Sequence, residues 1–108
     1  MNLPKPIADL IAAQNEYDSK AYADNFSGDA IVYDEGKVYH GEEEIRQWNE
    51  MTNAKYHTKL EPLEISNKGE KSIVTVMVSG TFDGSPIPLK YHFEIKESKI
   101  TSLRITNN

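Results

Sequence analysis

Asp34 is the residue whose type and position could do chemistry in this sequence. It ends the stretch from Ala30 to Asp34, which reads as a strand. Side chains alternate along a strand, so Asp34 points into the core if Val32 does. Burial in apolar surroundings raises the pKa of a carboxyl group toward the range where it can exchange protons with a substrate. The alternative is a structural role in which Asp34 caps the turn at Gly36.

Other polar side chains could assist a base at this position. A hydroxyl from Tyr91 or Tyr17 could orient a substrate oxygen, because a phenol donates a hydrogen bond. His40 lies near the strand that should pair with the strand of Asp34, so a hydrogen bond between Asp34 and His40 is feasible. A surface or capping role for His40 is the alternative. The candidate catalytic residues are Asp34, Tyr91 and His40.

A second group of residues is expected to line a cavity. Aromatic side chains on expected inward faces suit flat apolar ligands, although inward aromatic residues also form ordinary core. Gln14 continues the apolar stripe of the first expected helix, so its amide needs a partner, which could be Asp34, a water or a ligand. The candidate ligand-binding residues are Gln14, Tyr17, Phe26, Trp48 and Phe93.

Several chemistries are excluded or unsupported. The chain has no cysteine, which excludes disulfides, thiolate nucleophiles and cysteine-based zinc sites. The three histidines, His40, His57 and His92, have no spacing typical of a metal site, so no metal is expected. The sequence lacks a glycine-rich phosphate loop and a Gly-x-Ser-x-Gly elbow. We therefore expect no cofactor, no nucleotide and no serine-hydrolase chemistry.

The charge pattern argues against nucleic acid and membrane partners. Twelve Lys and Arg residues, scattered singly, stand against 17 Asp and Glu residues, giving a net charge of −5. Nucleic acids and anionic membranes require concentrated positive charge. No apolar run is long enough to span a bilayer, and the first ten residues lack the pattern of a secretory signal. A cytoplasmic location is expected.

The first half of the chain should supply the helices. Pro4 and Pro6 suit the first turn of a helix that runs to about residue 16. Asp18 or Ser19 can cap a short second helix that carries Tyr22 and Phe26 and stops near residues 27–28. Residues 30–34 and 38–40 should form a strand pair. A third helix is expected after Gly41, with residues 42–44 supplying negative charge to its first turn, Glu42 pairing with Arg46, and a buried stripe of Ile45, Trp48 and Met51 or Thr52.

The second half should form long strands, broken near residues 67–69, 83–86 and 97–98. The apolar pattern changes phase at Pro62, which predicts a bulge. In residues 73–78, apolar side chains occur at both even-numbered and odd-numbered positions, which point to opposite faces of a strand. Both faces of the sheet should therefore be covered there. The helices can cover one face and a second copy of the chain the other, which predicts a homodimer through the sheet face. An unusually thick core within one chain is the alternative.

This order of elements predicts an α+β fold, with N-terminal helices packed on a strongly curved antiparallel sheet. The stretches YADNFSGDAIVYD, residues 22–34, and YHGEEEIRQW, residues 39–48, resemble the SnoaL-like branch of the nuclear transport factor 2-like superfamily. The resemblance runs nearly end to end and implies one SnoaL-like domain over residues 1–108. It also implies a cone shape, with a cavity between the helices and the concave face of the sheet.

The resemblance also bears on function. Asp34 occupies the position that looks like the proton-abstracting Asp of ketosteroid isomerases, a worked example of pKa tuning. The isomerase's oxyanion-binding Tyr falls at Leu10, and its protonated Asp falls near Tyr91, so half of that constellation is missing. Loss of one such donor commonly costs about 3–4 kcal/mol. A steroid isomerase is therefore not expected.

The function expected from the sequence is the binding of a small apolar molecule that carries oxygen. The domain could act on it as a cofactor-free acid–base enzyme of isomerase, cyclase or hydratase type. The alternative is a non-catalytic ligand-binding or protein-interaction module with the same fold.

Overall fold

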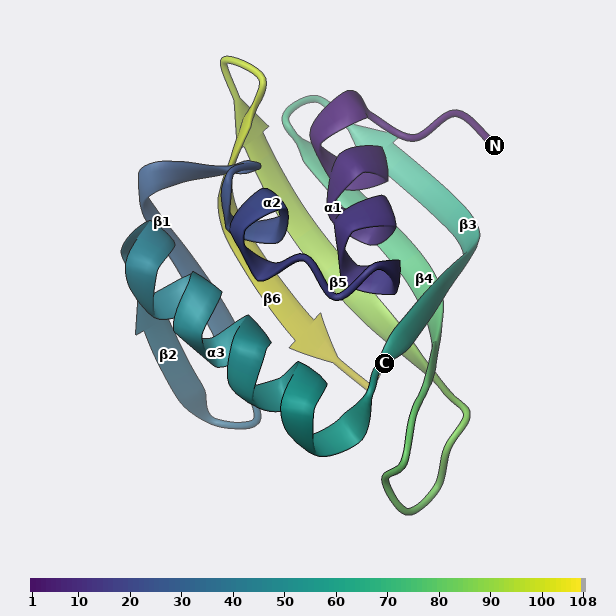
Figure 1. Cartoon of the computed structure of the whole chain (residues 1–108). Coiled ribbons are helices and arrows are strands. Elements are labelled where there is room, and N and C mark those ends of the chain that lie inside the picture. Colours follow the sequence, from purple (N-terminus) through teal and green to yellow (C-terminus); the bar gives the residue numbers. More distant parts are fainter. Residues whose placement is uncertain (108) are drawn as a thin grey trace.

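Three helices cover one face of a six-stranded sheet in the computed structural model, which describes residues 1–107 (Figure 1). The helices are α1 (Lys5–Asn15), α2 (Ser19–Ala23) and α3 (Gly41–Tyr56). The strands are β1 (Phe26–Asp34), β2 (Lys37–His40), β3 (Lys59–Lys68), β4 (Lys71–Ser79), β5 (Ile87–Lys96) and β6 (Lys99–Thr106). The α+β architecture with N-terminal helices on a sheet is therefore confirmed.

The strand order is β2-β1-β6-β5-β4-β3, and every pair is antiparallel except β1 with β6, which is parallel. The expectation of a wholly antiparallel sheet was wrong in this one pair. Strands β3 to β6 form a continuous meander, and its last strand returns beside β1 in the same direction. This parallel pair joins the strand that carries Asp34 to the rest of the sheet.

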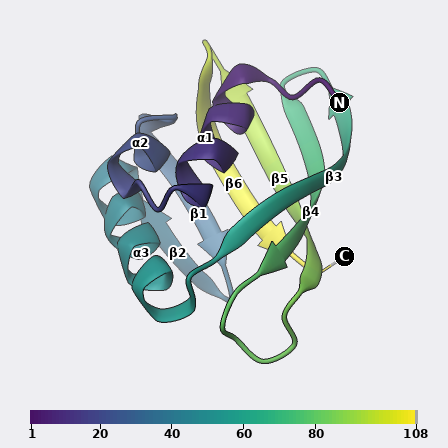
Figure 2. The same ribbon diagram turned by 45° about the vertical axis from the view of Figure 1, so that its right-hand side comes forward.

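The sheet bends around the helices, and its outer face carries no helix (Figure 2). The register between β3 and β4 shifts between Pro62 and Glu64, which confirms the predicted bulge. A bulge adds one residue to one strand and makes that strand bend.

Capping groups explain where the helices begin. The side chain of Asp18 accepts a hydrogen bond of 3.0 Å from the backbone N–H of Ala21, which caps α2 as predicted. The carboxylate of Glu44 reaches back to the backbone N–H of His40 at 2.8 Å, at the start of α3. Helix α2 is shorter than expected, and Phe26 begins β1 instead of ending a helix.

The inner face of α3 differs from the apolar stripe predicted for it. Ile45 and Trp48 are buried as expected, but Met51 is 57% exposed. Asn49 and Asn53 take the next buried positions, because polar partners from α1 and α2 meet them there. On the outer face, Arg46 pairs with Glu43 and Glu50 instead of Glu42.

A buried polar cluster joins the three helices and consists of Gln14, Ser19, Asn49 and Asn53. The amide of Gln14 donates to Asn53 Oδ1 at 2.7 Å and to the carbonyl of Thr58 at 2.9 Å. It accepts from Asn49 at 2.7 Å, and Ser19 donates to Asn49 at 2.7 Å. Every buried side-chain nitrogen and oxygen atom within residues 1–107 has a hydrogen-bond partner, so this cluster carries no unpaired side-chain group.

Within the described part of the chain, none of the helices combines the length and apolar character needed to cross a bilayer.

Candidate functional site

Asp34 lies on the concave face of the sheet, near the end of β1. Val32 on the same face is fully buried, and Asp34 is half-buried. Val32 pairs with Leu103 in the parallel register of β1 and β6. Two residues further along both strands, Asp34 is therefore level with Ile105. Ile105 pairs in turn with Tyr91 on β5. Asp34 and Tyr91 are thus level with each other two strands apart, with backbones about 10 Å apart.

The carboxyl group of Asp34 has no hydrogen bond or ion pair with any residue in 1–107. Burial raises the pKa of Asp34 to about 6, and the neighbouring charge of Glu35 adds to the shift. A carboxylate with a cationic partner shows the opposite shift. Asp34 is therefore a partly desolvated acid that changes protonation state close to neutral pH.

Two buried tyrosines lie close enough to Asp34 to respond to its charge. Burial raises the pKa of Tyr91, and Asp34 raises it further. Burial also raises the pKa of Tyr22, with smaller contributions from Tyr91 and Asp34. Both phenols therefore stay protonated at neutral pH and can act as hydrogen-bond donors.

The hydroxyls of Tyr22 and Tyr91 make no hydrogen bond to the described residues. Every fully enclosed polar side-chain atom in residues 1–107 does have a partner. The two hydroxyl oxygens are therefore not completely enclosed by side chains, although the tyrosines as a whole are only 2% and 6% exposed. Two hydroxyl donors and one carboxyl acceptor thus lack a partner among the described residues.

Aromatic rings surround these groups. Trp48 stacks on Tyr39 with ring centroids 5.2 Å apart, and it meets Tyr22 edge-on at 6.3 Å. Tyr39 lies opposite Val32 on β2, and its pKa is raised by burial and then by Asp34. These rings belong to the packed side chains between the helices and the sheet, where a cavity was expected.

Phe26 and Phe93 are 0% and 1% exposed and belong to the hydrophobic core. Phe26 packs on Tyr22 at 5.7 Å and Phe93 on Tyr91 at 6.1 Å, measured between ring centroids. They hold the two phenols in place from behind. Trp48, at 8% exposure, packs directly among the rings that face Asp34.

Three other candidate residues are not brought to Asp34. His40 pairs with Ile31, one residue out of phase with Val32 and Asp34, so it is exposed on the outer face of the sheet. The hydrogen bond considered between Asp34 and His40 is therefore absent. Tyr17 is 38% exposed and donates to the carbonyl of His57 at 2.9 Å. Gln14 has its amide occupied by the buried polar cluster.

Tyr22 and Tyr39 also lie within reach of the charge of Asp34 but were not among the residues predicted for the site. Alternation along residues 38–40 would have placed Tyr39 on the opposite face from His40. Tyr22 lies on a helix of five residues, which is too short for a helical period to reveal its inner face.

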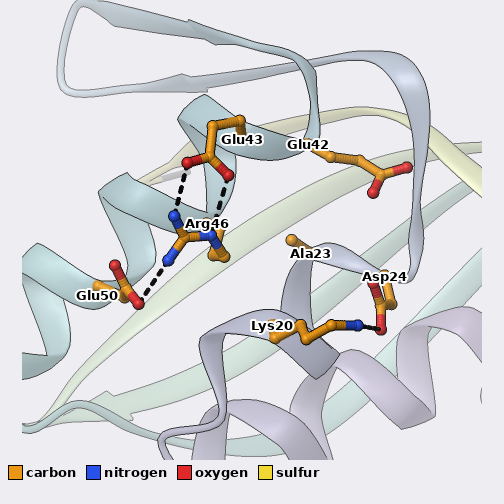
Figure 3. Close-up of a pocket in the computed structure, with 7 residues that line it drawn as sticks. All are labelled: Lys20, Ala23, Asp24, Glu42, Glu43, Arg46 and Glu50. Atoms are coloured by element: carbon orange, nitrogen blue, oxygen red, sulfur yellow. Dashed lines mark hydrogen bonds and ion pairs between the residues drawn. The ribbon is translucent and has the colours of Figure 1, made fainter.

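Two surface hollows lie away from this site. One, of about 450 Å³, is a groove between α2 and α3 lined by Lys20, Ala23, Asp24, Glu42, Glu43, Arg46 and Glu50 (Figure 3). Its cations are already paired, Arg46 with two glutamates and Lys20 with Asp24. The other, of about 510 Å³, lies between the start of α1 and the β5–β6 turn. Neither is lined by Asp34 or by the tyrosines.

Comparison with solved structures gives close matches over almost the whole chain. A protein from Sinorhizobium meliloti, described provisionally as a polyketide cyclase, is 36% identical, with a TM-score of 0.93 over 96% of this chain and 95% of that one. The epoxide hydrolase/cyclase-like enzyme SalBIII of salinomycin pyran-ring formation is 25% identical, with a TM-score of 0.78 over 94% and 87% of the two chains.

A protein with a ketosteroid isomerase-like fold from Catenulispora acidiphila, solved with trimethylamine, is 20% identical, with a TM-score of 0.87 over 96% and 85% of the two chains. At this identity the likeness concerns the fold alone. No protein-family model matches the sequence, and no curated protein matches it.

Proposed function

Because the chain belongs to the SnoaL-like branch of the nuclear transport factor 2-like superfamily, we propose that it binds a small, apolar, oxygen-bearing molecule and acts on it by cofactor-free acid–base chemistry. Asp34 is the proton acceptor, and Tyr91 donates a hydrogen bond to the substrate oxygen. The observation that carries the proposal is the half-buried carboxyl group of Asp34, which has no partner among the described residues and lies level in register with the buried residue Tyr91.

The proposed step is a proton transfer at carbon. The carboxylate of Asp34 takes a proton from a carbon next to a carbonyl group, and the electrons of that C–H bond move onto the carbonyl oxygen. Tyr91 stabilises the negative charge that develops there, because its phenol stays protonated. Asp34 then returns the proton to another atom of the same molecule. The result is an isomerisation, or a ring closure when the new nucleophile attacks within the molecule.

The pKa of Asp34 suits this role. At about 6, it leaves the carboxylate mostly ionised at pH 7 to 8, yet more basic than an exposed aspartate. Of the similar proteins, one is described provisionally as a polyketide cyclase and another is an epoxide hydrolase/cyclase-like enzyme. These descriptions support chemistry of the cyclase type on an oxygenated compound, with no metal or nucleotide in the scheme.

A non-catalytic pocket is the second candidate. The packed rings of Trp48, Tyr39 and Tyr22 favour it, because they leave little room for a substrate to rearrange. In this case Asp34 and Tyr91 would only hold a ligand. Replacing Asp34 would then change affinity, and no product would form.

We also propose that a second copy of the chain covers the outer face of the sheet. Ile73 is 38% and Val38 45% exposed on this face, which lies opposite the helices. A homodimer formed there would leave the concave site of each copy free. We further propose that the protein is cytoplasmic and that it binds neither nucleic acids nor membranes.

Deuterium exchange tests the catalytic proposal without knowledge of the natural substrate. Small cyclic ketones and enones are incubated with the protein in D2O, and loss of the C–H signals next to the carbonyl is followed by proton NMR. We expect exchange with the unmodified protein and at least a hundredfold slower exchange with Asp34→Asn. Asp29→Asn, an exposed carboxylate on the same strand, is the control. Equal exchange by Asp34→Asn and the unmodified protein would remove Asp34 from the mechanism.

A further inference from the structure

The outer face of the sheet, which no helix covers, has a histidine near its centre (Figure 2). The strand registers place one row of side chains at the same level across all six strands, and the row consists of Ser66, Ile73, His92, Arg104, Tyr33 and Val38. His92 is the member of this row whose ordinary pKa lies close to neutral pH. Its charge therefore sets the charge of the row under mild conditions.

Two cations lie beside His92 on this face. Arg104 on β6 pairs with His92 in register, and Lys90 lies two residues before it on β5. Among residues 1–107, neither Lys90 nor Arg104 forms an ion pair with a carboxylate. Burial lowers the pKa of His92 below its ordinary value of 6.5, and the charges of Arg104 and Lys90 lower it further. His92 is therefore neutral at pH 8.

The strands beside His92 offer a protonated imidazole no counter-charge. The neighbouring positions on β4 and β6 carry no carboxylate; they are Lys71, Ile73, Thr75, Ser102, Arg104 and Thr106. Glu94, two residues further along β5, pairs in register with Lys71. Glu64 lies on the edge strand β3, where it accepts a hydrogen bond of 3.4 Å from Thr75. Protonation of His92 would therefore add a third positive charge beside Lys90 and Arg104.

The charges of the outer face suit a second copy of the chain. A two-fold contact uses the same patch on both copies, so each copy offers Glu64 and Glu94 to cations of the other that have no ion pair of their own. The same symmetry brings His92 of both copies into one interface. Contact with the second copy would remove water from His92, which penalises its charged form.

We propose that His92 makes this dimer sensitive to pH: two copies associate when His92 is neutral and separate when it is protonated. The inference rests on the dimer of the proposed function and is independent of the chemistry at Asp34. An imidazolium in the interface would lose its hydration while facing Lys90 and Arg104, and both effects oppose association.

Mass action gives the size and direction of the effect. The neutral form of His92 favours the dimer, so the dimer is fully stable at pH 8 and weakens as the pH falls below 6.5. Because each dimer contains His92 twice, its dissociation takes up as many as two protons. The dissociation constant can therefore rise by up to about a hundredfold for each unit of pH in this range.

Light scattering after gel filtration tests the inference at pH 8, 6.5 and 5.5. The ionic strength is kept low and constant, because salt screens exposed charges. For the unmodified protein, we expect the mass of two chains at pH 8 and the mass of one chain at pH 5.5. Circular dichroism at each pH verifies that the chain stays folded, which separates dissociation from acid unfolding.

Three histidine variants assign the effect. His92→Gln cannot be protonated, and its amide can still bond to Thr106, which His92 contacts at 2.9 Å. This variant should stay dimeric at pH 5.5, and so should His92→Asn, a second neutral variant. His40→Gln is the matched control, because His40 is exposed on the same face but in the next row, opposite Ile31. It should dissociate as the unmodified protein does.

Each result decides the inference. Dissociation of the folded protein at pH 5.5 that either neutral variant of His92 prevents supports it. A folded dimer at every pH, or equal dissociation by both neutral variants, overturns it and leaves the dimer itself intact. Loss of the dimer at pH 8 in both neutral variants also overturns it, since neutrality would not be what the contact requires. An unmodified protein that is monomeric at pH 8 overturns the dimer and the inference together.

Discussion

Asp34 on β1 and Tyr91 on β5 face each other across the concave side of β6, level in register although they are far apart in sequence. The parallel pairing of β1 with β6 creates this relationship. It brings a carboxyl group with no partner among the described residues beside a phenol that stays protonated. Proton transfer in an apolar setting requires such a combination of acceptor and donor.

The rate of deuterium exchange should depend on pH through Asp34. Only the carboxylate accepts a proton, so the rate should rise with pH and reach half its plateau near 6. Glu35→Gln should move this midpoint down, because the charge of Glu35 helps to raise the pKa of Asp34. A profile that is flat between pH 5 and 7 would show that Asp34 is not the titrating base.

The same shift predicts that Asp34 destabilises the fold at neutral pH. Its pKa is higher in the folded chain than the ordinary value of 3.8, so the folded state binds more protons between pH 4 and 6. The free energy of unfolding should therefore fall as pH rises through this range, and the loss persists above it. Allowing for solvent screening at this half-buried group, Asp34→Asn should add about 1–2 kcal/mol at pH 8.

Thermal melts of the two proteins at pH 4 and pH 8 measure this effect. The variant should melt several degrees higher at pH 8, whereas the two proteins should be similar at pH 4. Greater stability of the unmodified protein at pH 8 would mean that the carboxylate has a stabilising partner.

Gln14 should matter for stability and not for ligand binding. Gln14→Ala removes the hydrogen bonds that Gln14 makes with Asn49 Nδ2, Asn53 Oδ1 and the carbonyl of Thr58, which should cost about 2–3 kcal/mol. Gln47→Ala, which removes one exposed hydrogen bond on α3, should change stability by less than about 0.5 kcal/mol. Urea unfolding measures both values. A stable Gln14→Ala protein with altered enone affinity would instead place Gln14 in the binding site.

The proposed dimer can be tested at Ile73. Ile73 lies opposite His92 on the outer face, and Arg104 follows His92 in register. Ile73→Lys would add a positive charge to the row formed by Ile73, His92 and Arg104. In a two-fold contact through this face, the added positive charges of the two copies would oppose each other. By light scattering, we expect a mass twice the 12.2 kDa of one chain for the unmodified protein and the mass of one chain for the variant. Met51→Lys, exposed on the helical side, should remain dimeric, and a monomeric unmodified protein would contradict the proposal.

Local signals in the sequence predicted most of the fold. Prolines, caps and acidic first turns placed the helices, and the phase change at Pro62 located the bulge. The parallel pairing of β1 with β6 depends on contacts between distant segments, so no local pattern encodes it. The buried Asn49 and Asn53 were missed for the same reason, since their partners come from other helices.

The candidate site was predictable only in part. The alternation of side chains along the strand that contains Val32 pointed to Asp34, and Tyr91 was proposed because its phenol can donate a hydrogen bond. Tyr22 could not be found, because a helix of one turn has no period to read. The hydrogen bond considered between His40 and Asp34 does not form, because alternation places His40 on the outer face, in agreement with the alternative of a surface role.

The protonation of Asp34 itself is the most direct test of the account. Carbon-13 NMR can follow the aspartate carboxyl signals from pH 3 to 9, with Asp34→Asn identifying the signal that belongs to Asp34. The account predicts a midpoint of about 6 for this group. A midpoint near the ordinary value of 3.8 would mean that the carboxylate is solvated or paired, and would contradict a base held in the apolar site.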